Sequence, residues 1–132
     1  MKLIYLAHPV SGDVETNVRS ARAWYERLTR AYLGEIGFVA DWLLWVGAFK
    51  DEAEFRIHGL AFDCELAARC DGLWCVGPRL SAGMLVEANA AHDAGHEVLD
   101  LTGEDVGRNG LFSLIQIIDA RRRWLSRRES KG

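Results

Sequence analysis

Cysteine is scarce in this sequence, and the few cysteines form no recognisable metal-binding or disulfide pattern. There are 3 cysteines in 132 residues, an odd number, and no two of them are spaced as Cys-x-x-Cys. Cys64, Cys70 and Cys75 lie within apolar stretches, where a thiol packs as a small hydrophobic group. We therefore expect no metal, no redox cofactor and no disulfide framework, and we interpret the thiols as reduced core residues of a cytoplasmic protein.

The sequence also lacks long apolar runs and an excess of basic residues. No run reaches the roughly 18 apolar residues that a membrane span requires, and the short apolar run after Met1 and Lys2 does not resemble a signal peptide. The chain has 16 Lys and Arg against 19 Asp and Glu, a net charge of −3, whereas proteins that bind polyanions carry a surplus of positive charge. These absences argue against a membrane or a polymeric nucleic acid as partner.

What the sequence does contain is the composition of an ordinary globular protein. Hydrophobic residues make up 49% and charged residues 27%, which are typical of folded domains. A chain of this length buries enough surface to fold without disulfides. We expect one domain spanning residues 1–132.

Short apolar runs alternate with amphipathic segments along the chain. Residues 3–7 are continuously apolar, as in a strand that is buried on both faces of a parallel sheet. From Val14 to Tyr32, apolar residues recur every three or four positions, which is the spacing of a helix. The alternation continues, and it predicts further strands at 38–40, 72–76 and 98–101, and further helices from about 51 to 69, from the loop 77–83 to about 95, and from about 111 onward.

This alternation predicts an α/β fold of the flavodoxin-like, doubly wound type. Such a fold has a mostly parallel sheet, here of four or five strands, with helices on both faces. Its ligands bind outside the carboxyl ends of the strands. Three segments are therefore candidates for ligand binding: the loop after Ala7, residues 41–45, which end the second strand or form a loop, and the loop 77–83.

Glu87 is the only formally charged residue between Leu80 and Ala91. Its neighbours on the predicted helix are small or apolar, so burial of the carboxylate is costly unless it is paired or used in chemistry. Two interpretations remain open. Glu87 is a nucleophile or an acid–base group in a half-buried pocket, or it is a salt-bridged or solvent-facing glutamate.

The loop before Glu87 has the composition of an anion-binding turn. Ser81, Gly83 and the free amides at a helix start form a cradle for an anion. Arg79 can add a charge-assisted contact to a phosphate or carboxylate. The alternative is an ordinary connection in which Ser81 only caps the helix.

Two other acidic residues are candidates to face Glu87 across a pocket. Asp63 lies beside the apolar stripe of its predicted helix, and Asp71 falls at the start of the third strand. Two carboxyl groups that flank one bond are the usual equipment for glycosidic cleavage. Alternatively, Asp63 pairs with Arg56 or Arg69 on the helix surface, and Asp71 is a turn residue.

The segments after the first two strands contain further candidates for ligand contact. We expect contacts from His8, Ser11 and Gly12 after the first strand, with no catalytic role for His8, and from Asp41 and Trp42 after the second. A tryptophan at this position can stack on a base. The chain has 5 Trp, so packing in the core or at a subunit interface explains the presence of Trp42 equally well.

Three segments, taken together, resemble those of a known family. They are residues 5–12 (YLAHPVSG), residues 60–71 with their two aspartates, and residues 81–87 (SAGMLVE). In this order they resemble the nucleoside 2-deoxyribosyltransferase-like superfamily, and within it a little-characterised branch of short phage and bacterial proteins. The likeness spans roughly residues 3–101.

The resemblance implies an enzyme that cleaves the N-glycosidic bond of a (deoxy)nucleoside or its 5′-monophosphate, without a cofactor. It implies that Glu87 attacks the anomeric carbon and forms a covalent sugar ester. By the same resemblance, Asp63 protonates or orients the departing base, and Tyr5 lines the sugar site and positions Glu87. Water then completes a hydrolysis, or a second base completes a transfer.

The resemblance also implies the remaining contacts and the assembly. Asp71 becomes a supporting acid, while Ser81, Gly83 and Arg79 hold the 5′ end of the sugar. Members of this superfamily are usually homo-oligomers, so we expect a homodimer or a larger homo-oligomer. In such an assembly Asn109 or Ser113 of a neighbouring chain is a candidate to reach the site.

Two other functions remain open. The chain is a non-catalytic module that binds or senses a nucleotide, or it is an assembly subunit whose Trp-rich segment 42–49 forms an apolar surface patch in place of a polar pocket. Geometry separates these possibilities. Carboxyl groups of Asp63 and Glu87 that lie more than about 10 Å apart, with no common cleft, would make two-carboxylate chemistry implausible.

Overall fold

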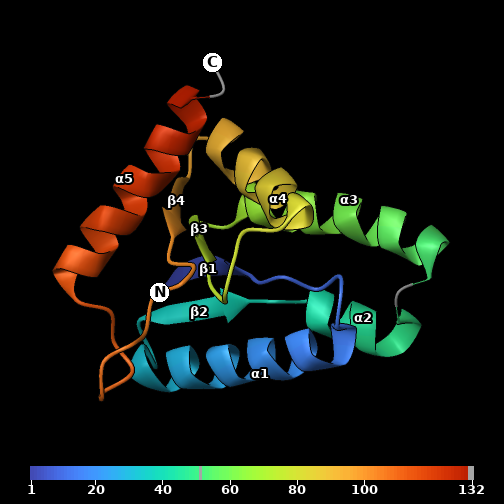
Figure 1. Cartoon of the computed structure of the whole chain (residues 1–132), viewed down its shortest axis with the longest axis horizontal. Helices are drawn as coiled ribbons and strands as arrows, with labels where there is room; N and C mark the ends of the chain where they lie inside the picture. The colour runs from blue at the N-terminus through green and yellow to red at the C-terminus, as the bar shows by residue number, and fades with distance from the viewer. Residues whose placement is uncertain (51, 131–132) are drawn as a thin grey trace.

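The fold is built on a parallel four-stranded sheet (Figure 1). The computed structural model describes residues 1–50 and 52–130. In this part of the chain the strand order is β2-β1-β3-β4, and each neighbouring pair is parallel. These four strands follow the flavodoxin-like order, so the predicted fold class is confirmed. The strands are β1 (Lys2–Ala7), β2 (Ile36–Val39), β3 (Gly72–Cys75) and β4 (Glu97–Asp100).

Five helices are found among the described residues. They are α1 (Val14–Ala31), α2 (Trp42–Phe49), α3 (Ala53–Arg69), α4 (Ala82–Asp93) and α5 (Leu114–Ser130). The predicted start of the third of these, near Asp51, lies outside the described residues. The other predicted helices and all four predicted strands have counterparts in the structure.

Alternate residues of the strands pack into two hydrophobic cores, one on each face of the sheet. In β1, Ile4 and Leu6 join the core that contains Leu28 of α1, whereas Tyr5 and Ala7 join the core with residues of α3 and α4. This period of two is the geometry of a strand covered on both sides. Accordingly α1 and α5 lie on one side of the sheet, and α3 and α4 pack against each other on the other side (Figure 1).

The segment after β2 corrects the prediction. The sequence predicts a strand end or a loop at residues 41–45, but α2 begins at Trp42. This helix is apolar along its whole length, so no helical periodicity marks it in the sequence. Its position comes from a tertiary contact, because the buried Trp42 indole donates a hydrogen bond from Nε1 to the Leu6 carbonyl oxygen at 2.9 Å.

Two element boundaries also differ from the prediction. β2 begins at Ile36, two residues earlier than expected, so that it starts opposite Lys2 of β1. The last helix begins at Leu114, not near 111, because the Ser113 hydroxyl accepts a hydrogen bond from the Gln116 amide at 3.1 Å and caps it.

The topology reverses direction between β1 and β3. From β1 the chain leaves through α1 to β2 on one side, whereas β3 and β4 lie on the other side of β1. At such a reversal the loops that follow the two central strands diverge, and they leave a crevice beyond the carboxyl ends of the strands. Residues 8–12 and residues 77–83 are the two loops in question.

Candidate active site

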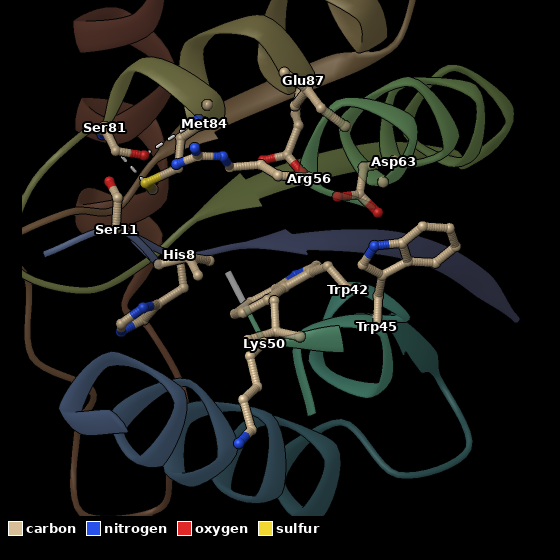
Figure 2. Close-up of a pocket in the computed structure, with 15 residues that line it drawn as sticks. His8, Ser11, Trp42, Trp45, Lys50, Arg56, Asp63, Ser81, Met84 and Glu87 are labelled. Atoms are coloured by element: carbon tan, nitrogen blue, oxygen red, sulfur yellow. Dashed lines mark hydrogen bonds between the residues drawn. The ribbon is translucent and has the colours of Figure 1, made fainter. Parts of the chain in front are cut away.

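A cavity of about 300 Å³ lies at this crevice. It is lined by residues that follow β1, residues of α2 and α3, and the first turns of α4 (Figure 2). The space is large enough for a small metabolite. Four segments that are distant in the sequence therefore meet at one site.

Glu87 projects into this cavity from the second turn of α4. Its side chain is only 7% exposed, and the buried Tyr5 hydroxyl donates a hydrogen bond to Glu87 Oε2. Met84 lies one turn earlier on α4 and lines the same cavity. The solvent-facing interpretation of Glu87 therefore fails.

Asp63 faces the same cavity from α3. The residue is 9% exposed, and its carboxyl group also interacts with the Tyr5 hydroxyl. Arg69, one of the two arginines considered as its surface partner, instead contacts Glu65 at 3.4 Å. Asp63 and Glu87 thus line one cavity (Figure 2). The Tyr5 hydroxyl interacts with both carboxyl groups.

Burial raises the pKa of both carboxyl groups. The pKa of Glu87 rises from 4.5 to about 8, mainly through loss of hydration and further through the nearby Asp63, while the Tyr5 hydrogen bond opposes the rise. The pKa of Asp63 rises to about 7, again mainly through burial and then through the charge of Asp41. The two acids therefore titrate as a pair that retains a proton in the neutral range. Such a pair offers a carboxylate and a carboxylic acid in one site.

This burial makes a prediction for stability. Glu87 binds its proton more tightly in the folded chain than in the unfolded chain, so stability is lost as the pH rises from about 4.5 to about 8. A Glu87→Gln variant has no such charge. We expect it to match the wild-type protein at pH 4 and to exceed it at pH 9 by an unfolding free energy of the order of 5 kcal/mol. Denaturant titration at the two pH values measures this difference, and an equal difference at both would contradict it.

The segment after β1 supplies the opposite wall. His8 is buried and lines the cavity, with Nδ1 2.7 Å from the Pro9 carbonyl oxygen and Nε2 2.9 Å from Ser20 Oγ. Burial lowers the pKa of His8. Ser11 is exposed and lines the cavity, whereas Gly12 stands just behind it with a positive φ of 98°.

The start of α4 closes one end of the cavity. Ser81 caps the helix, because its hydroxyl oxygen accepts a hydrogen bond from the Met84 amide at 3.3 Å, and both Ser81 and Gly83 line the cavity. A Cβ at Gly83 would meet nothing within 4 Å, so a ligand has room there. Arg79 lies at the rim, where Nη2 donates to the Ser11 carbonyl oxygen at 3.4 Å.

The aromatic residues of α2 form the floor. Trp42 and Trp45 both line the cavity, but each indole N–H is already used, by Leu6 for Trp42 and by the Phe55 carbonyl oxygen at 2.9 Å for Trp45. Neither indole N–H group is therefore available to donate to a ligand. Asp41 precedes α2 and acts on the site through its charge on Asp63.

The family model described as a domain of unknown function (DUF7768) matches residues 2–100. The chain belongs to the DUF7768 family. All the carboxyl groups and loops described above fall within the matched residues.

Among solved structures, this DUF7768 chain is similar to a 2-deoxyribosyltransferase from the psychrotolerant bacterium Bacillus psychrosaccharolyticus. The TM-score is 0.51 and the sequence identity 19%, over 89% of this chain and 81% of the transferase. At this identity the likeness shows a shared fold. A search of curated proteins finds no match to the sequence.

Two predicted site residues lie elsewhere in the DUF7768 fold. Asp71 stands at the amino end of β3, opposite to the cavity, where Oδ2 accepts a hydrogen bond from the Leu3 amide at 2.8 Å. It is therefore a turn residue that ties two strands, as the alternative interpretation had it. Asn109 is in the loop before α5, where Oδ1 accepts from the Leu111 amide at 3.1 Å, and it does not line this chain's cavity.

Sequence reasoning missed two basic residues of the cavity, Lys50 and Arg56. Arg56, Gly59 and Asp63 are spaced so that they share one face of α3, and this spacing is a signal that places Arg56 beside Asp63. A signal for Lys50 is absent, because it follows α2, whose helical state the sequence does not reveal.

The part of the DUF7768 chain that the structure describes contains no group of three or more His, Cys, Asp or Glu side chains placed to hold a metal ion. Within the same residues, no helix combines the length and the apolar character needed to cross a membrane.

Proposed function

We propose that this protein cleaves the N-glycosidic bond of a (deoxy)nucleoside or nucleoside 5′-monophosphate. The observation that carries the proposal is the pair Glu87 and Asp63, both buried, both facing one cavity and both in contact with the Tyr5 hydroxyl. Burying two acids is costly and contributes nothing to folding, so a chemical role accounts for it better than a structural one. The shared fold with a 2-deoxyribosyltransferase supports the choice of substrate class.

In the proposed reaction the two acids share one proton and have separate roles. The Tyr5 hydrogen bond stabilises the Glu87 carboxylate, so the reactive form is the one in which Asp63 carries the proton. A carboxylate oxygen of Glu87 attacks the anomeric carbon, the bond from that carbon to the base nitrogen breaks, and the electron pair leaves with the base. The base takes up the proton that Asp63 carries. The result is a free base and a sugar ester on Glu87.

The second half of the reaction releases the sugar. Water gives its proton to Asp63 and attacks the anomeric carbon, the ester bond breaks, and Glu87 leaves as a carboxylate. A second base nitrogen in place of water makes the reaction a transfer. Two displacements retain the configuration at the anomeric carbon.

Tyr5 has a positioning role in this scheme. Its hydroxyl donates to Glu87, so it orients the carboxylate and favours the charged form. Burial and the neighbouring Glu87 raise the pKa of the Tyr5 hydroxyl well above its ordinary value, and the phenol therefore remains a donor throughout the neutral range.

The test is an activity screen of the purified full chain. We expect a free base to appear when the protein is incubated with a panel of ribo- and 2-deoxyribonucleosides and their 5′-monophosphates, followed by chromatography. Quenched mixtures should contain a protein species heavier by one sugar, with the mass gain on the peptide that contains Glu87. Tight nucleotide binding without any base release would favour the non-catalytic sensing module instead.

The assembly-subunit hypothesis is less well supported. Exposed apolar side chains do occur on α2 and α3, among them Leu44 and Ile57. That hypothesis predicts an apolar surface patch and no polar pocket. The cavity contradicts it, because two buried carboxyl groups face into this cavity.

A further inference from the structure

The cavity has two chemically different ends. The acidic end holds Glu87, Asp63 and the Tyr5 hydroxyl. At the other end, the hydroxyl-bearing residues Ser11 and Ser81 face each other (Figure 2). The amino end of α4 opens here, and its free amides add partial positive charge.

Arg56 belongs to this second end. It lines the cavity from the first turn of α3, and its guanidinium group reaches toward Ser81 and Met84 (Figure 2). Arg56 already interacts within the chain. A guanidinium group has five N–H donors, so it can keep that interaction and bind an anion as well.

Arg79 adds a second positive charge at the rim of the same end. Its guanidinium group contacts the Ser11 backbone at 3.4 Å, so it stands beside the hydroxyl groups, not beside the carboxyl groups. Lys50 also lines the cavity, but its amine points away from both carboxyl groups and toward α1 (Figure 2). Arg56 reaches toward Ser81, and Arg79 contacts Ser11, so each of the two serines has an arginine from another segment on its side of the cavity.

The two ends are spaced to suit a phosphorylated sugar. Ser81 and Glu87 are six residues apart on α4, which is about 9 Å along the helix axis. A pentose whose anomeric carbon lies at Glu87 extends its 5′ carbon toward Ser81. A 5′-phosphate can accept charge-assisted hydrogen bonds from the arginines and the helix amides, which a neutral nucleoside cannot do.

We infer that the substrate is a nucleoside 5′-monophosphate, with its phosphate bound by Arg56, Arg79, Ser11, Ser81 and the first amides of α4. This inference rests on the proposed function, because it takes Glu87 as the group that meets the anomeric carbon. It goes further in naming the charge state of the substrate and the residues that recognise it.

The experiment compares each nucleoside with its own 5′-monophosphate. We expect kcat/KM for the monophosphate to exceed that for the nucleoside by at least about 100-fold, since several charge-assisted hydrogen bonds are added. An Arg56→Gln variant should lose about 10- to 100-fold in kcat/KM on the monophosphate. The loss on the nucleoside should be at least about 10-fold smaller than the loss on the monophosphate.

Arg69→Gln is the matched control, because it makes the same substitution on the same helix at an exposed residue that contacts Glu65 and does not line the cavity. It should leave the ratio between the two substrates unchanged. Thermal unfolding of each variant checks that it is folded.

The outcomes separate the two proposals. Equal kcat/KM on nucleoside and monophosphate, or an equal loss on both in Arg56→Gln, overturns the phosphate assignment and leaves the proposed function standing. No base release from any substrate overturns both. A preference for the monophosphate that Arg56→Gln abolishes supports the inference.

Discussion

Replacing Glu87 with glutamine is expected to reduce base release by about 10⁴-fold or more. A glutamine amide oxygen is a poor nucleophile, so the sugar ester cannot form, and loss of a covalent nucleophile costs several orders of magnitude. The rate of base release measures the effect. Mass spectrometry of quenched reactions should at the same time show no sugar adduct on the variant.

The glutamine variant is well suited to this test, because its fold should be intact. Glutamine has nearly the size of glutamate, and its oxygen can accept the hydrogen bond from Tyr5 that Glu87 accepts now. Glu65→Gln, on the solvent side of α3, provides a matched control with the same change of charge. Base release by Glu87→Gln at the wild-type rate would remove the proposed mechanism.

The second large effect is expected at Gly77, in the loop that follows β3. Gly77 has φ +102°, and a Cβ added to it would lie 2.9 Å from the His8 ring and 3.1 Å from Pro9 Cδ. His8 cannot give way easily, since both ring nitrogens are in hydrogen-bond contact and the residue is buried. We expect Gly77→Ala to lower the free energy of unfolding by about 3 kcal/mol, from the left-handed backbone and the overpacking together. For a chain of this size that is a fall in Tm of roughly 10 °C.

Gly95→Ala is the control for this prediction. Gly95 follows α4 with φ +88°, but a Cβ there would meet nothing within 4 Å. The control therefore carries the backbone cost alone, about 1 kcal/mol. If the two substitutions lower Tm equally, the close packing of His8 against Gly77 does not contribute to the loss of stability, and the prediction is wrong.

The site illustrates a conflict between stability and chemistry. The same carboxyl group is expected to be essential for base release and to destabilise the folded chain above neutral pH, because its charge is buried with a tyrosine and a second acid. Glu87→Gln should therefore be inactive and, at pH 9, more stable than the wild-type protein. Such a trade-off is typical of residues that are retained for function.

Much of the fold could be predicted because its signals are local. The continuous apolar run of β1 and the three-to-four spacing in α1 follow from burial on two faces and on one face, and both elements are present. The helical state of α2 could not be predicted in this way. Its eight residues are almost uniformly apolar, so nothing in the sequence separates a helix from a strand, and the contact of Trp42 with β1 decides the outcome.

The candidate site shows the same division. The isolation of Glu87 among apolar residues marks it as unusual in the sequence alone, and the helix stripe beside Asp63 indicates partial burial. Asp71 carries the same kind of charge, yet it lies at the wrong end of its strand. Its distance from the cavity depends on strand direction and register, and the sequence does not specify these for a single residue.

The sequence by itself determined the class of fold, the order of its elements and the presence of one exceptional glutamate, because patterning and burial cost act within a short stretch of chain. Only the tertiary structure decided that the Tyr5 hydroxyl interacts with both Asp63 and Glu87. It also decided that Arg56 reaches toward the start of α4 (Figure 2). These groups come from separate elements, and the packing of α3 against α4 on one face of the sheet brings them together. The sequence around any one of these residues does not determine the distances between them, because those distances depend on how the helices pack on the sheet.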